Sequence, residues 1–136
     1  MRIFRLWIDG RVHVVRVDDE CSKCGSIMIV DNLNAELDCV EIGCNHSAPM
    51  MHPDLQAKWE SMSITEKIEA YAIPKGCRTR EKDKMVELID ASGKIYLVFS
   101  PDFPVHWGSV IDWLLQKHWI KPDAVETIAQ VEVQSL

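Results

Sequence analysis

The sequence predicts an α+β fold made of antiparallel β-hairpins, a cysteine-rich insertion and two or three helices. Three observations lead to this class. β-Rich runs flank short turn sequences in both halves of the chain, four of the five cysteines fall within residues 21–44, and apolar residues recur at helical spacing after residue 53. With 136 residues, 47% of them hydrophobic, the chain suits one compact domain over 1–136.

The N-terminal stretch FRLWIDGRVHVVRV predicts the first hairpin. Asp9-Gly10 favours a two-residue turn, because both residues tolerate positive φ angles. Such a turn pairs Ile8 with Arg11 and gives one strand face to Phe4, Leu6 and Ile8. The adjacent residues Val14 and Val15 break the alternation and predict a bulge or burial on both faces.

The cysteine-rich segment comes next, and residues 26–30 and 35–42 read as two strands around the turn-rich sequence DNLN. The sequence CNHSAPMMHPD then reads as a loop. A helix is expected from Pro53, because proline suits a first helical turn. A second helix is expected after Ser63, which has capping-box spacing to Glu66.

In the second half, KGCRTREKDK is polar and reads as an exposed loop. KMVELID and KIYLVFS, separated by ASG, predict a second hairpin. SPDFPVHWGSVIDWLLQKHWIKP predicts a helix of about four turns that ends before Pro122. The tail DAVETIAQVEVQSL has room for a short helix followed by a strand, but its pattern does not decide whether either forms.

The cysteine spacing indicates a metal site. Cys21-x-x-Cys24-Gly places two thiolates within reach of one ion, and the glycine relieves crowding where the backbone turns toward the sulfurs. Cys39 and Cys44 follow after a gap that holds two short strands, which would return the chain to the first pair. Four thiolates leave no open position for water, so the expected metal is a structural zinc ion.

The CxxCG knuckle, the hairpin and the second cysteine pair resemble a zinc ribbon, a module that spans residues 19–47 here. The second pair, in DCVEIGCNH, is similar to the C-x4-C half of phage late-gene activators of the Ogr/Delta type. The resemblance implies zinc binding at residues 21–46, and by analogy a phage or mobile-element origin.

Two histidines and one further cysteine leave alternatives open. His46 lies two residues after Cys44 and is an alternative metal ligand, as is the more distant His52. Cys77 has no neighbouring cysteine and reads as a free thiol. The alternative is a reactive thiol, whose pKa would be lowered by the nearby Lys75, Arg78 and Arg80.

Charge opposes nucleic-acid binding by the cysteine segment. The chain has a net charge of -6, and Lys23 is the only base between residues 18 and 46. The acids there number seven: Asp18, Asp19, Glu20, Asp31, Glu36, Asp38 and Glu41. Such a surface repels phosphates and favours a protein partner. The expected partner contacts are Asp18, Asp19, Glu20, Glu36, Asp38, Glu41, Lys75, Arg78, Arg80 and Trp107.

These patterns predict a small non-enzymatic zinc-binding protein that acts through protein–protein interaction, in one version as an inhibitor or regulator of a nucleic-acid-handling complex. One alternative is a sequence-specific DNA-binding transcription regulator, and another is a small zinc-dependent hydrolase. The motifs of phosphate loops, nucleophile elbows and HExxH enzymes are missing from the sequence. No apolar run is long enough to span a bilayer, and a cytoplasmic location is expected.

Overall fold

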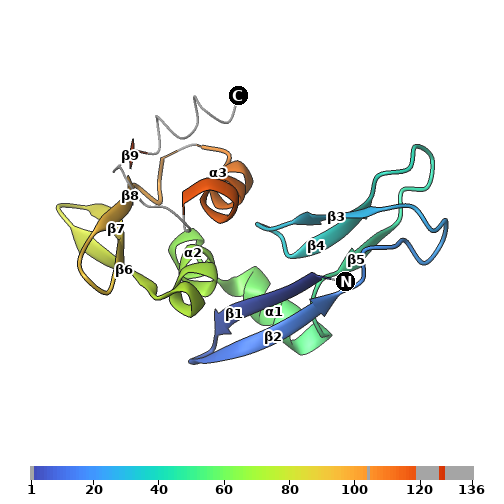
Figure 1. Cartoon of the computed structure of the whole chain (residues 1–136), viewed down its shortest axis with the longest axis horizontal. Coiled ribbons are helices and arrows are strands. Elements are labelled where there is room, and N and C mark those ends of the chain that lie inside the picture. The colour runs from blue at the N-terminus through green and yellow to red at the C-terminus, as the bar shows by residue number, and fades with distance from the viewer. Residues whose placement is uncertain (1, 104, 119–125, 128–136) are drawn as a thin grey trace. The chain divides into compact units, whose positions relative to one another are not determined.

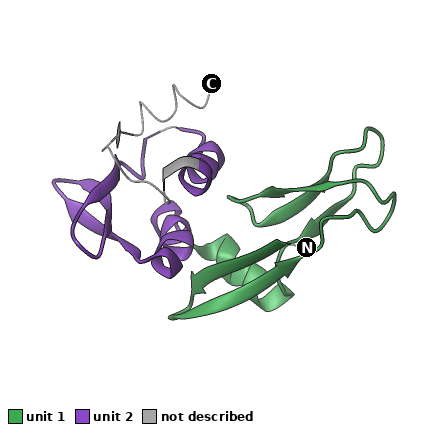
Figure 2. Ribbon diagram, viewed as in Figure 1, with its two compact units in different colours: residues 1–62 green, residues 63–136 purple. Residues whose placement is uncertain are grey.

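The computed structural model describes residues 2–103, 105–118 and 126–127 and confirms the α+β class with its antiparallel hairpins. The chain divides into two compact units, residues 1–62 and residues 63–136 (Figure 2). The cysteine-rich segment lies entirely in the first unit. The single compact domain over 1–136 stays a prediction.

The first unit begins with the predicted hairpin, β1 (Arg2–Ile8) and β2 (Arg11–Val17). Ile8 pairs with Arg11 across a turn in which Asp9 and Gly10 have φ angles of 56° and 81°. The face that carries Leu6 and Ile8 is buried, together with Val15 and Val17 of β2. The predicted bulge was wrong, because the pairing runs without a register shift and simply turns Val15 inward and Val14 outward.

A three-stranded antiparallel sheet follows, formed by β3 (Met28–Asp31), β4 (Glu36–Cys39) and β5 (Ser47–Pro49) in that order (Figure 1). The two predicted strands are confirmed, although both are shorter than expected. The predicted loop after them was partly wrong, since it contains β5. Three residues are too few for a visible alternation, and Pro49 is tolerated because β5 is an edge strand.

Helix α1 (Pro53–Ser61) completes the first unit and lies against β1. His52 caps it by accepting a hydrogen bond from the Asp54 N–H. Trp59 is fully buried, and its indole N–H donates to the Leu33 carbonyl at 2.8 Å. Lys58 forms an ion pair with Asp9 in the β1–β2 turn. The helix therefore holds both the β3–β4 connection and the first hairpin.

The second unit opens with α2 (Ile64–Ala72) and a short 3-10 turn, η1 (Ile73–Lys75). The predicted capping box is present, because Ser63 and Glu66 exchange side-chain to backbone hydrogen bonds at the start of α2. Ile68 and Tyr71 are buried on one face of this helix. Gly76 ends the segment with a φ angle of 81°, which favours glycine.

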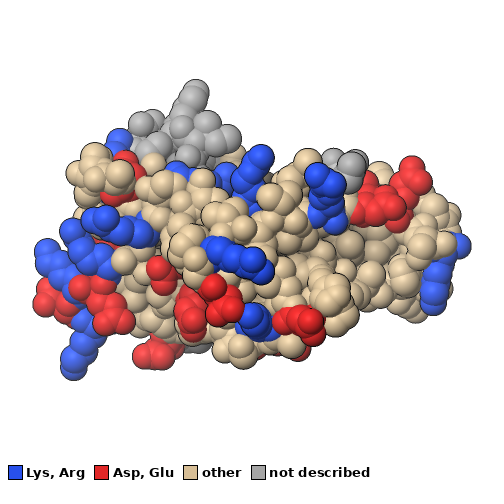
Figure 3. All heavy atoms as spheres, turned by 90° about the horizontal axis from the view of Figure 1, so that it is seen from below, with Lys and Arg blue, Asp and Glu red and all other residues tan. Residues whose placement is uncertain are grey.

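The sheet of the second unit contains β6 (Cys77–Lys82), β7 (Met85–Asp90) and β8 (Ile95–Phe99) in antiparallel order, with β9 (Glu126–Thr127) parallel to β8. The predicted β7–β8 hairpin is confirmed. The predicted polar loop was wrong, because most of KGCRTREKDK forms β6. Its side chains are almost all polar, so the sequence shows no hydrophobic alternation. Figure 3 shows basic and acidic side chains intermixed where the β6–β7 hairpin lies, at the left of the view.

The predicted long helix begins as α3 (Trp107–Trp113) and continues as a π-helical turn, η2 (Leu114–His118). Trp107 is buried and packs edge-on against Phe99, with ring centroids 5.6 Å apart. The predicted end before Pro122 and most of the tail lie outside the described residues. Within the described ranges, no helix is both long and apolar enough to cross a membrane.

Candidate metal centre

The four cysteines of residues 21–44 form one cluster. Their sulfur atoms all lie within 4.8 Å of one another, with Cys24 and Cys39 at 3.4 Å and Cys21 and Cys44 at 3.7 Å. Each close pair joins one cysteine of the first knuckle to one of the second. The structure therefore brings together the set that the spacing predicts.

Backbone hydrogen bonds shape both knuckles. In the first, the Cys21 N–H donates to the Ser26 carbonyl at 2.7 Å and the Lys23 N–H points at the Cys21 sulfur at 3.4 Å. Gly25 has a φ angle of 77°, which explains the glycine after the CxxC pair. In the second knuckle, the Glu41 N–H points at the Cys39 sulfur at 3.4 Å. N–H groups aimed at sulfur stabilise thiolates.

The sheet closes the two knuckles on each other. Met28 of β3 pairs with Cys39 of β4, and the Val40 N–H donates to the Ile27 carbonyl at 3.1 Å. The Cys39 N–H donates to the His46 carbonyl at 3.0 Å. These bonds bring the second knuckle beside the first.

The sulfur distances fit a four-coordinate metal ion. A tetrahedral zinc site with Zn–S bonds of about 2.3 Å has sulfur–sulfur edges of about 3.8 Å. The observed 3.4 and 3.7 Å pairs lie near that edge. A disulfide would need about 2.05 Å, and all five cysteines are free thiols. The cluster is thus suited to one ion with four sulfur ligands.

The thiols differ in their readiness to ionise. Hydrogen bonding from Ser26 lowers the pKa of Cys24 to about 6. At Cys39 the Glu41 N–H acts to lower the pKa, but burial and hydrogen bonds to the other thiols outweigh it and raise the pKa to about 12. Thiols that share one site cannot all ionise without a cation to balance them. A bound divalent ion supplies that balance.

The two histidines have other roles. The His46 imidazole lies 3.3 Å from the Ser22 hydroxyl and is not one of the clustered ligand groups. His52 is the N-cap of α1. Four sulfurs already complete a tetrahedral set, so neither histidine is needed as a ligand.

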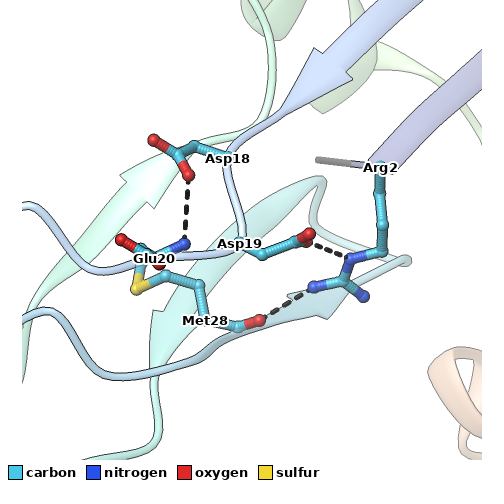
Figure 4. Close-up of polar contacts among 5 residues, drawn as sticks. All are labelled: Arg2, Asp18, Asp19, Glu20 and Met28. Carbon is cyan, nitrogen blue, oxygen red and sulfur yellow. Dashed lines mark hydrogen bonds and ion pairs between the residues drawn. The ribbon is translucent and has the colours of Figure 1, made fainter.

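Several acids of the segment serve the local structure. Asp19 accepts a hydrogen bond from the Arg2 guanidinium at 2.7 Å, and Arg2 also donates to the Met28 carbonyl at 2.8 Å (Figure 4). The hydrogen bond from Arg2 to Met28 links β1 to β3. Asp18 accepts from the Glu20 N–H at 3.1 Å, as the same view shows.

The remaining acids near the knuckles range from half-buried to exposed. Asp38 is half-buried and accepts from the Ser47 hydroxyl at 2.7 Å, and Glu36 is also half-buried. Glu41 is exposed and accepts from the Ser26 hydroxyl at 3.2 Å. Glu20 is exposed. The expected acidic surface around the cysteines is therefore present.

The expected contacts outside this segment lie in the second unit. Lys75 and Arg78 are exposed, and Arg80 donates two hydrogen bonds to the nearly buried Glu87 at 2.8 and 2.9 Å. Trp107 is buried against Phe99, which gives it a core position rather than the expected contact position.

Cys77 is a free thiol, as predicted, and it is buried. Burial raises its pKa, which opposes the alternative of a reactive thiol with a lowered pKa. Its basic neighbours Arg78 and Arg80 cannot offset the desolvation of the thiolate, because both side chains reach toward solvent or toward Glu87.

The structure also shows an apolar surface that the sequence analysis missed. Ile27, Ile29 and Val40 are between 49% and 65% exposed, and Ile42 in the second knuckle is 97% exposed. Ile29 pairs with Asp38, and Glu20 pairs with Ile27 in an isolated bridge. We call Glu20, Ile27, Ile29, Asp38 and Val40 the ribbon face. The alternation of these residues with the buried Met28 and the half-buried Cys39 along the two strands was the signal that could have revealed this face.

The class that the fold and the cluster define is a small α+β protein with a zinc-ribbon-like four-cysteine segment. The chain matches no protein-family model, no curated protein and no solved structure.

Proposed function

We propose that this protein binds one structural zinc ion through Cys21, Cys24, Cys39 and Cys44 and acts as a non-enzymatic protein-binding module. The observation that carries the proposal is the approach of all four sulfur atoms to within 4.8 Å of one another. Sulfur-only tetrahedral sites hold zinc or iron. Zinc is favoured because the first knuckle, Cys21-x-x-Cys24-Gly, has the spacing of a zinc ribbon.

The zinc is structural in this proposal, because four thiolates fill a tetrahedral shell and leave no position for a reacting water. Its role is to close the β3–β4 hairpin on the two knuckles. Apart from Cys21, the buried apolar side chains of residues 19–47 are Met28, Ala35 and Leu37. A segment with so few buried apolar residues depends on a metal for much of its stability.

The ribbon face is the proposed contact surface. It presents three aliphatic side chains that are about half exposed or more, next to the carboxylates of Glu20 and Asp38. Exposed aliphatic clusters with a polar rim are typical of protein interfaces. A matching partner has aliphatic residues together with Lys or Arg.

The same charge disfavours nucleic acid as the direct ligand of this face. A regulator that blocks the basic channel of a nucleic-acid-handling complex would need such an acidic surface. This regulatory role stays a prediction, and so does a phage or mobile-element origin.

Two measurements test the proposal. Elemental analysis of the purified protein is expected to give one zinc per chain, with four sulfur ligands in the X-ray absorption spectrum; an oxygen ligand would point to a hydrolase instead. A gel-shift titration at low salt is expected to show no nucleic-acid binding. A tight complex that weakens steeply with salt would replace the protein-binding proposal with the DNA-binding alternative.

A further inference from the structure

A second exposed sheet face lies on the β1–β2 hairpin. The strand register places three cross-strand pairs on it, Ile3 with Arg16, Arg5 with Val14, and Trp7 with Val12. This is the face opposite Leu6 and Ile8, and we call its six residues the hairpin face. Ile3, Val12 and Val14 are 54%, 46% and 56% exposed, and Trp7 is half-buried. A sheet face with this much exposed aliphatic surface is suited to a partner.

The charge of the hairpin face is positive. Arg5 and Arg16 are exposed, and in the part of the chain that the structure describes neither takes part in an ion pair. By contrast, the nearby Arg2 is engaged by Asp19. Two unpaired guanidinium groups thus alternate with β-branched side chains across the face.

The ribbon face also combines exposed aliphatic and charged side chains, but its charges are negative. Its cross-strand neighbours are Ile27 with Glu20 and Ile29 with Asp38, so each aliphatic side chain lies beside a carboxylate. Both faces belong to residues 1–62, and both are exposed, so they do not cover each other within one chain. Aliphatic surface and complementary charge are what two packed sheet faces need.

We propose that the ribbon face of one copy of this chain packs on the hairpin face of a second copy. The contact joins two different surfaces, so it is head-to-tail and produces a closed ring or a chain of copies. This inference rests on the proposed function, because the zinc-closed knuckles hold the ribbon face, and it names the partner of that face.

The hairpin face favours a protein over a single nucleic-acid strand. Strand-binding surfaces carry several exposed aromatic side chains on which bases stack. Here one aromatic residue, Trp7, is present among the six and is half-buried, while three positions hold Ile or Val. β-Branched side chains pack against another sheet and offer nothing to a base.

Analytical ultracentrifugation of the zinc-loaded full chain tests the proposal. The average mass is expected to rise with protein concentration up to about 1 mM, a range that reveals weak contacts. Association is expected to weaken as salt is added, since both partners bear exposed charges. Two variants are then compared, R5E/R16E for the hairpin face and E20K/D38K for the ribbon face.

Each variant alone is expected to stay monomeric, because both its faces then carry the same charge. An equimolar mixture of the two is expected to associate again, since each altered face meets a face of opposite charge. Arg11→Glu is the matched control, because Arg11 is an exposed arginine of the same hairpin that lies on the other face, paired with Ile8. It is expected to associate like the unaltered protein.

The proposal is overturned if the unaltered protein stays monomeric at every concentration. It is also overturned if both charge-reversal variants still associate on their own, or if their mixture does not associate. Zinc content, measured on the same samples, separates this result from the proposed function. A chain that holds zinc and stays monomeric loses only the self-association, whereas a chain that binds no zinc refutes the proposed metal centre itself.

Discussion

Two cysteines of equal burial make the metal centre testable by a single substitution. Cys21 and Cys77 are 3% and 4% exposed, and only Cys21 lies in the sulfur cluster. Replacing either with serine buries a hydroxyl group, which costs about 1–3 kcal/mol. At Cys77 the cost is expected at the lower end, because Tyr96 lies within hydrogen-bonding reach of that side chain.

Cys21→Ser is expected to cost much more, because it also removes a zinc ligand. Structural zinc supplies about 10–16 kcal/mol of apparent free energy in small zinc modules. Losing even half of that is about 5 kcal/mol or more, which matches the entire stability of many small domains. We therefore expect the segment around β3, β4 and β5 to unfold in Cys21→Ser while Cys77→Ser keeps its fold and its zinc.

Amide hydrogen exchange read by mass spectrometry measures this locally. In Cys21→Ser, peptides from residues 18–50 are expected to lose protection, and peptides from residues 77–99 serve as an internal reference. Elemental analysis of the same samples follows the zinc. Equal losses of protection and unchanged zinc in the two variants would refute the argument, because burial alone would then explain both.

Three further predictions follow from single contacts. Trp59→Phe is expected to cost about 1–3 kcal/mol, because the Leu33 carbonyl loses its donor; the denaturation midpoint should fall with an unchanged slope. Ser63→Ala is expected to cost about 1 kcal/mol through loss of the capping box, with Ser63→Thr as the mild control. In metal-free protein at pH 7, iodoacetamide is expected to modify the four clustered cysteines before Cys77, because their segment opens without zinc while Cys77 stays buried with a raised pKa; peptide mapping with time would reveal any other order.

The local elements could be predicted where the sequence itself contains their cause. Asp9-Gly10 specifies the first turn through its tolerance of positive φ angles, and Ser63 with Glu66 specifies the start of α2 through its own hydrogen bonds. The four-cysteine set was equally predictable, because ligand spacing along the chain limits which thiols can meet.

The elements that could not be predicted depend on partners distant in sequence. β5 has only three residues and exists because Leu37 and Ala48 pair across the sheet. β6 consists mostly of charged residues, and it is a strand because β7 lies beside it. Cys77 has basic neighbours in sequence, but its pKa is raised because the fold buries the thiol.

The sequence by itself determined the four-cysteine set through its paired spacing, the Asp9-Gly10 turn, the Ser63–Glu66 cap and the acidic character of residues 18–46. Only the tertiary structure decided which apolar residues stay outside. Val14 and Val15 are both valines, yet Val14 is exposed and Val15 is buried. Ile27 and Ile29 are exposed, whereas Ile8 is buried. Strand register, not residue type, decides which of them joins the core. Exposure is a property of pairing and packing across the whole unit, so the two faces of opposite charge became visible only in the folded chain.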